Sequence, residues 1–449
     1  MKEKTFYELN SSQEVVKLQC QYTLFKRVIN IVMSAESCDK IDFELMKKAF
    51  NILVERNDCT RIRFCKQKNK IVQYFEENVT FDKIPYYEFS SKSEQENFIK
   101  KESHKAIKYM KGEVIKPFFI KTYNNKYMVL LKVCHLILDA YGLNILFKDL
   151  FEIYEALKNN TELPKPLNKF EDVIKKDLTL KNNEDFFEKN KEFFTDYLQS
   201  KPMPYYAGLH GLTTKLSKKL FKTHSMKMFF VKNNTQGYML PFSKGLGEKI
   251  LEFCKENKTT PSNLIFYACS VTLSKMNNDV ENMLPLELCN ARATALERNC
   301  AGTKVQSIAC YTVVDKERSF KDNFSDFCSQ QNILYRHLGF SDIAFEKLLH
   351  NVYKKPFLTT LYSLTYSFIP IYKPQGINFQ LYSNGKCALP AYLATMFDVE
   401  SHEMEMIYDC QTKIINEKNV QHFHKNLMNL LKNVIEDPNK LIKEISMEE

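Results

Sequence analysis

A nearly continuous apolar run constrains the fold of this chain more than any other feature of its sequence. Residues 126–138 read KYMVLLKVCHLIL, with only Lys132 and His135 as polar residues inside the run. A run of this kind is typical of a strand that is buried on both faces of a sheet. We therefore predict a strand over 126–138, with His135 close to its end.

A turn and a helix are predicted directly after this strand. Residues 139–142, DAYG, have the composition of a turn. Apolar residues then recur at intervals of three and four, which is the period of a helix: Leu143, Leu146, Phe147, Leu150, Ile153, Tyr154 and Leu157. Residues 126–158 thus predict a strand, a turn and a helix in succession.

Similar signals predict alternating helices and strands in both halves of the chain. In the first half, Asp42 is a candidate N-cap for a helix over 43–54, and strands over 60–64 and 71–75 predict a hairpin. In the second half, the sequence predicts strands over 283–289, 305–314 and 359–368. It also predicts four helices: one capped by Ser243, one that begins at Thr260-Pro261, one that follows Ser319 and one over 417–436. This alternation predicts an α/β protein.

The length of 449 residues predicts two lobes instead of one small domain. Prolines at 164, 166, 202 and 204 bracket a charged segment, which also contains a predicted helix over 183–198. We therefore predict an N-terminal lobe over 1–165, a linker segment over 166–205 and a C-terminal lobe over 206–449.

The cysteines and the apolar stretches indicate a cytoplasmic protein. Thirteen cysteines occur without any CxxC pair, so we expect reduced, mostly buried thiols and no metal site. The first residues are polar and lack the apolar core of a signal peptide. The most apolar stretch, 127–147, includes Lys132, His135 and Asp139, so no membrane span is expected.

The net charge of +10 leaves several explanations open. Lysine and arginine number 64 against 54 acidic residues, and most of the lysines are isolated. A solvated lysine-rich surface explains this balance, as does an acidic carrier protein or a phosphorylated cofactor as partner. No nucleic-acid-binding motif accompanies the charge, so a nucleic-acid partner is not expected.

His135 and Asp139 form the candidate chemical site. A histidine near a strand end can act as a general base, because its ordinary pKa of about 6.5 allows it to take a proton near neutral pH. Asp139 can orient the imidazole, or it can brace the chain reversal against an arginine. A buried histidine whose hydrogen bonds are satisfied is the alternative. None of the other eight histidines is followed by an aspartate four residues later.

The segment CHLILDAYG resembles the HHxxxDG motif of the condensation-domain superfamily. That superfamily includes the condensation domains of nonribosomal peptide synthetases and the chloramphenicol acetyltransferase-like acyltransferases. Further segments resemble other motifs of the superfamily in the same order: 9–14 (LNSSQE), 49–64, Phe193 or Phe194, 259–263 (TTPSN), 290–292 (NAR), 301–303 (AGT) and Tyr408-Asp409.

The resemblance implies a fold and a set of roles. It implies two chloramphenicol-acetyltransferase-like α/β lobes arranged as a V, a pseudo-dimer with a tunnel between the lobes, in a monomeric protein. It implies that His135 is the catalytic residue and that Asp139 is a structural residue paired with Arg292. The donor is then a phosphopantetheine thioester on a carrier protein or on CoA, and no cofactor is bound permanently.

Two positions depart from the motif. Cys134 replaces the first histidine, and strand alternation predicts that it is a buried thiol pointing away from His135. Ala140 replaces a glycine, which strains the turn if that position has a positive φ, although Gly142 lies close by. The backbone of Ala140, Tyr141 and Gly142 can help to hold a developing oxyanion.

Three functions are open at this stage. The first is amide or ester formation from a carrier-bound acyl, aminoacyl or peptidyl thioester in nonribosomal peptide or natural-product biosynthesis, with an amine or alcohol acceptor and a carrier supplied in trans. The second is a CoA-dependent O- or N-acyltransferase. The third, which Cys134 and Ala140 motivate, is a catalytically inactive module that recruits other proteins.

Overall fold

The computed structural model describes residues 4–447 except 24, 213–217, 220–221, 223, 228–232 and 357–358. The chain forms two compact units, and both are discontinuous in sequence. Unit 1 consists of residues 1–182, 290–305 and 370–386, and unit 2 contains the remainder. The boundaries predicted at 165 and 206, the V-shaped arrangement and the tunnel stay predictions.

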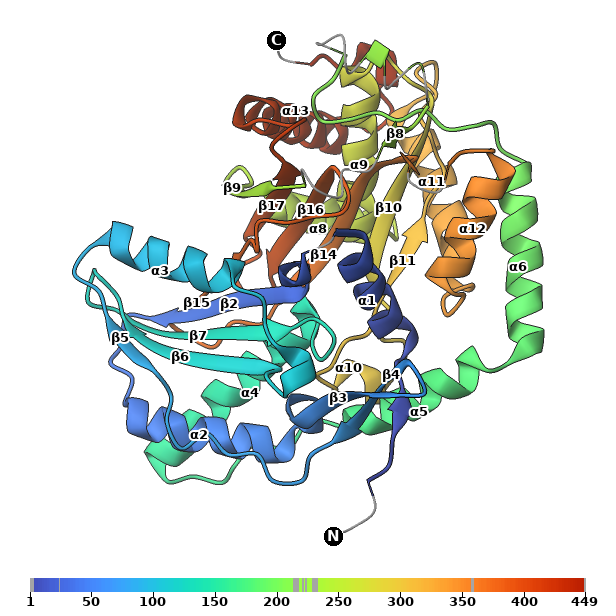
Figure 1. The fold of residues 1–449 in the computed structure, drawn as a ribbon. Helices are drawn as coiled ribbons and strands as arrows, with labels where there is room; N and C mark the ends of the chain where they lie inside the picture. The colour runs from blue at the N-terminus through green and yellow to red at the C-terminus, as the bar shows by residue number, and fades with distance from the viewer. Residues whose placement is uncertain are drawn as a thin grey trace. The chain divides into compact units, whose positions relative to one another are not determined.

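Unit 1 is built on a mixed sheet in which, among the described residues, the strand order is β15-β2-β7-β6-β5 (Figure 1). The strands are β2 (Asn30–Ser37), β5 (Tyr86–Glu88), β6 (Ile115–Lys121), β7 (Tyr127–Cys134) and β15 (Ile377–Tyr382). All neighbours are antiparallel except β5 and β6. The β15 strand comes from a segment that is distant in sequence, and it pairs with β2 along its full length.

Helices cover both faces of this sheet (Figure 1). Helices α2 (Phe43–Arg56) and α4 (Ala140–Asn159) pack against each other on one face, and α3 (Lys92–His104) lies on the other. The predicted N-cap of α2 is confirmed, because Asp42 accepts hydrogen bonds from the amides of Glu44 and Leu45. The short helices η1 (Lys26–Ile29), η2 (Asp58–Arg61) and η3 (Tyr109–Lys111) connect other elements of the unit.

A smaller sheet, β1-β4-β3, and two helices complete unit 1. Its strands are β1 (Tyr7–Glu8), β3 (Ile62–Gln67) and β4 (Lys70–Phe75), and the helices are α1 (Ser11–Thr23) and α5 (Phe170–Lys181). The predicted hairpin is confirmed as β3 and β4, although β3 begins two residues later than predicted because residues 58–61 form η2. The short helix α10 (Ala295–Arg298) also belongs to this unit.

The strand predicted over 126–138 extended four residues too far at its C-terminal end. Strand β7 ends at Cys134, residues 135–137 form a turn, and α4 begins at Ala140. The amide of Ile137 donates to the carbonyl of Cys134 at 2.9 Å, which closes the turn earlier than the apolar run indicates. Apolar composition alone does not distinguish a buried strand from a buried turn.

Within the described residues, unit 2 contains a seven-stranded sheet with the order β11-β10-β14-β16-β17-β9, and β12 also pairs with β10. The bounds are β9 (Thr235–Pro241), β10 (Asn282–Asn290), β11 (Val305–Ala309), β12 (Thr312–Val313), β14 (Tyr362–Ile371), β16 (Ala391–Asp398) and β17 (Met404–Gln411). Strands β8 (Met226–Lys227) and β13 (Thr359–Thr360) form a separate pair. The predicted strand over 305–314 is therefore two short strands.

In the described part of unit 2, the helices are α6 (Glu184–Gln199), α8 (Leu246–Glu256), α9 (Pro261–Met276), α11 (Phe320–Tyr335), α12 (Asp342–Val352) and α13 (Glu417–Glu436), and the short helix η4 (Ile442–Glu444) follows α13. Thr260 caps α9 and Pro261 occupies its first turn, as predicted. The prediction that Ser243 caps α8 was wrong, because Gly245 is the N-cap and makes no side-chain cap bond. Helices α3, α5 and α12 were not predicted from the sequence.

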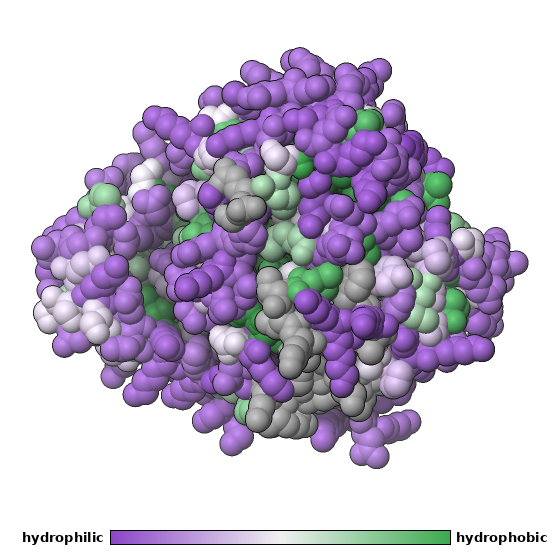
Figure 2. Space-filling view, turned by 90° about the horizontal axis from the view of Figure 1, so that it is seen from above, coloured by the Kyte–Doolittle hydropathy of each residue, from purple (hydrophilic) through white to green (hydrophobic). Residues whose placement is uncertain are grey.

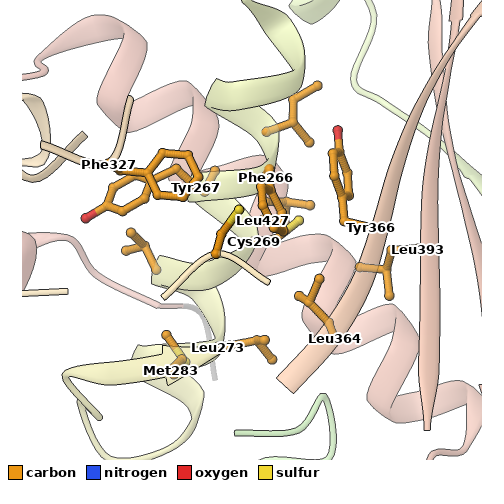
Figure 3. Packing of buried hydrophobic residues seen from close by; sticks show 14 of the residues in the cluster. Phe266, Tyr267, Cys269, Leu273, Met283, Phe327, Leu364, Tyr366, Leu393 and Leu427 are labelled. Atoms are coloured by element: carbon orange, nitrogen blue, oxygen red, sulfur yellow. The ribbon is translucent and has the colours of Figure 1, made fainter. Parts of the chain in front are cut away.

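The core of unit 2 surrounds helix α9, which is buried along almost its whole length (Figure 3). The ring of Phe266 stacks on that of Tyr366 in β14 with centroids 5.0 Å apart. Leu393 of β16 and Leu427 of α13 pack in the same cluster. A helix that is buried on all sides in this way is central to its domain.

The burial of the cysteines and the polarity of the surface fit what the composition predicts. All thirteen cysteines are free, and seven of them are buried, as predicted. The face of the protein shown in Figure 2 is mostly hydrophilic, with small scattered apolar areas. None of the helices in the part of the chain that the structure describes is long and apolar enough to cross a membrane.

Candidate active site

His135 is the first residue after strand β7 in unit 1. Its amide donates to the carbonyl of Ile29 at 2.8 Å, just before the neighbouring strand β2 begins, so its backbone is fixed at the sheet edge. The side chain is partly exposed, whereas the preceding Cys134 is completely buried. Burial also raises the pKa of the Cys134 thiol, which makes this residue a poor nucleophile.

The surroundings of His135 favour the neutral form of its imidazole at pH 7. Burial lowers its pKa from the ordinary value of 6.5. The charge of Asp139 and hydrogen bonding to the backbone of His135 itself and of Leu138 oppose this shift without cancelling it. Nδ1 lies 3.5 Å from Oγ1 of the buried Thr303. If Nδ1 carries the proton, Nε2 has a free lone pair and can accept a proton from a substrate.

Asp139 braces the chain reversal instead of touching the imidazole. It is the N-cap of α4, and its Oδ1 accepts from the amide of Gly142 at 2.7 Å. Its Oδ2 accepts from the amide of Lys304 at 2.7 Å. The guanidinium of Arg292 donates to both carboxylate oxygens, at 2.9 and 3.1 Å. The sequence left two roles open for Asp139, orienting the imidazole and bracing the chain reversal against an arginine. Its hydrogen bonds fit the second role.

Arg292 is enclosed by partners from its own loop and from α4. Its side chain is only 1% exposed. Besides Asp139, it donates to Oδ1 of Asn290 at 2.8 Å and to the carbonyl of Gly302. Its guanidinium carbon lies 4.8 Å from the ring centre of Tyr141. An ion pair buried in this way organises geometry more than it adds stability.

Two glycines allow residues 301–304 to lie directly against the start of α4. A Cβ on Gly142 would lie 2.8 Å from the Gly302 carbonyl oxygen, which is too close. Gly302 has a φ of +107°, and a Cβ there would collide with the ring of Phe170. Both positions therefore need glycine. By contrast, Ala140 is the first residue of α4 and does not have a positive φ, so it introduces no backbone strain.

The start of α4 also limits which backbone amides could hold a developing oxyanion. The amide of Gly142 already donates to Asp139, so it is not available to a substrate. The amides of Ala140 and Tyr141 are the ones that stay candidates for this role.

A glutamine pair, whose role the sequence analysis missed, supports the turn that carries His135. Nε2 of Gln13 donates to the carbonyl of Leu136 at 2.8 Å and lies 2.8 Å from Oε1 of Gln73. Gln13 also exchanges hydrogen bonds with Asn10, whose Nδ2 reaches the Thr303 carbonyl at 3.4 Å. In the sequence, Gln13 was noted only as part of the segment 9–14 that resembles the family's opening motif. Gln73 could have been noticed only as a polar residue inside a predicted strand.

The chain segment 301–304 is held by a further ion pair. Nζ of Lys304 lies 2.9 Å from Oδ1 of Asp177 in α5. Oδ2 of the same aspartate accepts from the amide and the hydroxyl of Ser11 at 2.8 and 2.9 Å. Helices α1, α4 and α5 are thus connected through buried polar groups around His135. Across the described residues, no cluster of three or more histidine, cysteine, aspartate or glutamate side chains could hold a metal ion.

Comparison with known proteins identifies the family. A family model described as "Condensation domain" matches residues 3–449. The chain belongs to the condensation-domain family. Among curated relatives of this condensation domain, one of the plipastatin synthase subunits of Bacillus subtilis (strain 168) is 19% identical over 359 residues, which are 79% of this chain and 13% of that protein. Gramicidin S synthase 2 of Brevibacillus brevis is 22% identical over 374 residues, 77% of this chain and 8% of that protein. The condensation domain thus spans a small part of the length of these relatives.

Solved structures show the same fold across the whole condensation domain. The starter condensation domain of rhizomide synthetase, in complex with C8-CoA, superposes with a TM-score of 0.82 at 13% identity and covers 99% of this chain and 98% of its own. The first condensation domain of the calcium-dependent antibiotic synthetase, in complex with a substrate analogue, has a TM-score of 0.83 at 11% identity and covers 99% of both chains. At these identities the likeness shows the fold alone.

Proposed function

We propose that this condensation domain joins an acyl, aminoacyl or peptidyl group from a phosphopantetheine thioester to an amine or hydroxyl acceptor, in nonribosomal peptide or natural-product biosynthesis. The observation that carries the proposal is the placement of a neutral, partly exposed His135 in a turn braced on three sides. Asp139 and Arg292 hold one side, Gln13 the second and Thr303 the third.

In the proposed reaction, the acceptor nitrogen or oxygen attacks the carbonyl carbon of the thioester. Its proton passes to Nε2 of His135, and the negative charge collects on the former carbonyl oxygen. The tetrahedral intermediate then collapses, and the carbon–sulfur bond breaks. The leaving thiolate takes the proton from the imidazolium, so the histidine is regenerated and the products are an amide or ester and a free thiol.

Asp139 and Arg292 act as positioning residues in this proposal. Both carboxylate oxygens of Asp139 are used by hydrogen-bond donors, so it is not available as a second proton acceptor. The pair fixes where β7 ends and α4 begins, and thereby where the imidazole lies. A displacement of about 1 Å at such a position can cost about 100-fold in rate.

The departures from the family motif do not argue against catalysis. Cys134 is a buried thiol, and Ala140 begins a helix without strain. The inactive recruiting module is therefore kept only as an outcome of the experiment below. A CoA thioester as donor is supported by the rhizomide synthetase domain, which was solved in complex with C8-CoA, and a carrier-bound donor is tested beside it.

The experiment measures thiol release and product mass with acyl-CoA and acyl-carrier donors and a panel of amines and alcohols. Wild type is compared with His135→Ala and with His422→Ala, an exposed histidine on α13 that serves as matched control. We expect His135→Ala to lower turnover by about 100-fold or more, the usual contribution of a general base, and the control to be unchanged. Equal turnover in His135→Ala rejects the proposal. The absence of release from every donor, with a carrier protein still bound, supports the recruiting module.

A further inference from the structure

Thr303 places a hydroxyl group beside the imidazole of His135. Its Oγ1 lies 3.5 Å from Nδ1, and the residue is completely buried. Thr303 belongs to the segment 290–305, which joins unit 1 from a distant part of the sequence. In the proposed reaction, the proton moves at the other ring nitrogen, Nε2. Thr303 therefore lies beside the ring nitrogen that does not exchange a proton with the substrate.

Several polar contacts hold the backbone of Thr303 in place. Its carbonyl accepts a hydrogen bond from Nδ2 of Asn10 at 3.4 Å. The next residue, Lys304, donates its amide to Oδ2 of Asp139 at 2.7 Å, and its Nζ lies 2.9 Å from Oδ1 of Asp177. These contacts fix the place from which the hydroxyl reaches the imidazole.

Asp139 connects this hydroxyl to the turn that carries the imidazole. Its Oδ1 accepts from the amide of Gly142 in the first turn of α4, and its Oδ2 accepts from the amide of Lys304, which follows Thr303. The turn that begins at His135 ends at this same aspartate. One carboxylate therefore fixes both the segment that carries the imidazole and the segment that carries the hydroxyl.

Backbone carbonyls favour one ring nitrogen of His135 as the site of the proton. Burial lowers the pKa of the imidazole, and the charge of Asp139 and hydrogen bonding to the backbone of His135 itself and of Leu138 oppose this shift. A carbonyl only accepts, so it opposes the shift by binding a ring N–H. The carbonyl of a histidine is within reach of its own Nδ1, which is the ring nitrogen nearer to the backbone. Nδ1 is therefore the protonated nitrogen, and the hydroxyl oxygen of Thr303 is a further acceptor for it.

We propose that Thr303 is a positioning residue that holds the proton of the neutral imidazole on Nδ1 and so leaves the lone pair on Nε2. The hydroxyl oxygen accepts from Nδ1–H, and its own hydrogen rotates towards another acceptor. The distance of 3.5 Å is long for such a bond, and catalytic hydrogen bonds commonly tighten when substrate binds. The consequence for proton transfer rests on the proposed function, because Thr303 acts through His135.

The opposite direction of this hydrogen bond has the opposite effect on the pKa of His135. If the hydroxyl accepts from Nδ1–H, the bond is present in both protonation states and is stronger in the charged one, so its loss lowers the pKa. If the hydroxyl donates to Nδ1, the bond exists only in the neutral imidazole, and its loss raises the pKa. The sign of the change therefore decides between the two directions. Asp139, whose charge acts on this imidazole, is kept in every variant.

Nitrogen NMR of protein labelled with ¹⁵N in its nine histidines tests the proposal without any reaction. Comparison with His135→Gln identifies the His135 signals, and their shifts report which ring nitrogen is protonated. We expect Thr303→Val to lower the ratio of the Nδ1–H to the Nε2–H form by about three- to tenfold, the contribution of one neutral hydrogen bond, and to lower the pKa of His135. Thr303→Ser, which keeps the hydroxyl, should restore both. Thr179→Val, at an exposed position of α5, is the matched control and should change neither.

Several results of this NMR experiment overturn the proposal. A wild-type imidazole whose proton lies on Nε2 overturns it, as does a pKa of His135 that rises in Thr303→Val. A ratio that Thr303→Val leaves unchanged overturns it as well. Equal shifts in Thr303→Val and Thr303→Ser also overturn it, because they assign the effect to packing and not to the hydroxyl. Thermal unfolding verifies that each variant is folded, and Thr303→Ala gives the same comparison if the valine variant does not fold.

A kinetic comparison distinguishes this proposal from the proposed function. In Thr303→Val, kcat should fall by up to about tenfold while KM stays unchanged, because the hydroxyl contacts the ring nitrogen that does not meet the substrate. If no donor is turned over but the NMR ratio behaves as expected, the role of Thr303 stands and the acyltransferase proposal fails. If turnover depends on His135 while Thr303→Val keeps the wild-type ratio, the role of Thr303 fails alone.

Discussion

The Arg292 guanidinium donates hydrogen bonds to both carboxylate oxygens of Asp139, at 2.9 and 3.1 Å, although the two residues are 153 positions apart in the sequence. The residue that caps α4 is thereby fixed by a loop that enters unit 1 much later in the chain. The turn that carries His135 lies between this cap and the end of β7. The site thus depends on a long-range ion pair that does not itself take part in proton transfer.

The first prediction concerns this ion pair. Arg292→Ala should lower the free energy of unfolding of unit 1 by about 3–5 kcal/mol, because it leaves a buried carboxylate without its counter-charge. Asp139→Asn should be similarly costly, and the double variant should cost much less than the sum. Hydrogen exchange of the α4 amides in urea measures this locally. Strictly additive costs would contradict a direct pair.

The second prediction concerns pH. A general base must be neutral to accept a proton, so activity should rise with pH through the pKa of His135 and then level off. Because burial lowers that pKa below its ordinary value of 6.5, the midpoint of this rise should lie below pH 6.5. The pH profile of kcat/KM measures it. Since the charge of Asp139 raises this pKa, Asp139→Asn should move the acidic limb to still lower pH. A limb centred above pH 6.5 is the opposing result.

The third prediction contrasts two neighbouring small residues. Gly142→Ala should destabilise unit 1 by about 1–3 kcal/mol, because its Cβ would lie 2.8 Å from the Gly302 carbonyl oxygen. Ala140→Gly, which restores the glycine of the family motif, should bring no gain and should cost up to about 1 kcal/mol. Urea unfolding compares the two. A stabilised Ala140→Gly protein would show that the alanine is strained after all.

The fourth prediction concerns the glutamine that supports the His135 turn. Gln13→Ala leaves the Leu136 carbonyl and the Asn10 amide without their side-chain partner, both in buried surroundings. We expect a loss of about 1–3 kcal/mol in stability together with lower turnover. Gln421→Ala on the exposed face of α13 is the control and should change stability by no more than about 0.5 kcal/mol. Equal effects of the two changes would remove Gln13 from the site.

The fifth prediction concerns a buried acid in unit 2. Burial raises the pKa of Glu287 to about 7, although Gln331 and Tyr335 donate hydrogen bonds to it. The folded state then holds more protons than the unfolded state between about pH 4.5 and 7, so this group makes stability fall as pH rises through that window. Glu287→Gln should remove that part of the slope and should be more stable than wild type at pH 8.

Chemical denaturation at pH 5 and pH 8 measures the effect of Glu287→Gln. The difference between the variant and wild type should grow with pH, and Glu252→Gln on the surface of α8 should show no such trend. Oε1 of Gln331 makes no hydrogen bond within the described residues, so the new amide also has an acceptor nearby. A difference that does not change with pH would mean that Glu287 is ionised throughout.

The sequence alone determined the features that depend on local physics. Thr260 and Pro261 open α9, Asp42 caps α2 and apolar periodicity marks α4, because capping and amphipathic burial act over a few residues. The apolar run also located His135 at the end of a buried strand. The family resemblance then selected Asp139 and Arg292 from all the other charged residues.

The tertiary structure alone decided what lies around those residues. Gln73, Thr303 and strand β15 reach the His135 end of the sheet from segments that no local pattern connects. The turn that ends β7 at Cys134 is closed by the local bond from the Ile137 amide, and it is held by bonds from distant groups, the Ile29 carbonyl and the Gln13 side chain, that the apolar run does not reveal. The physical reason is that a polar group is placed in a core by the partner that satisfies it, and that partner can come from any part of the chain that folding brings near.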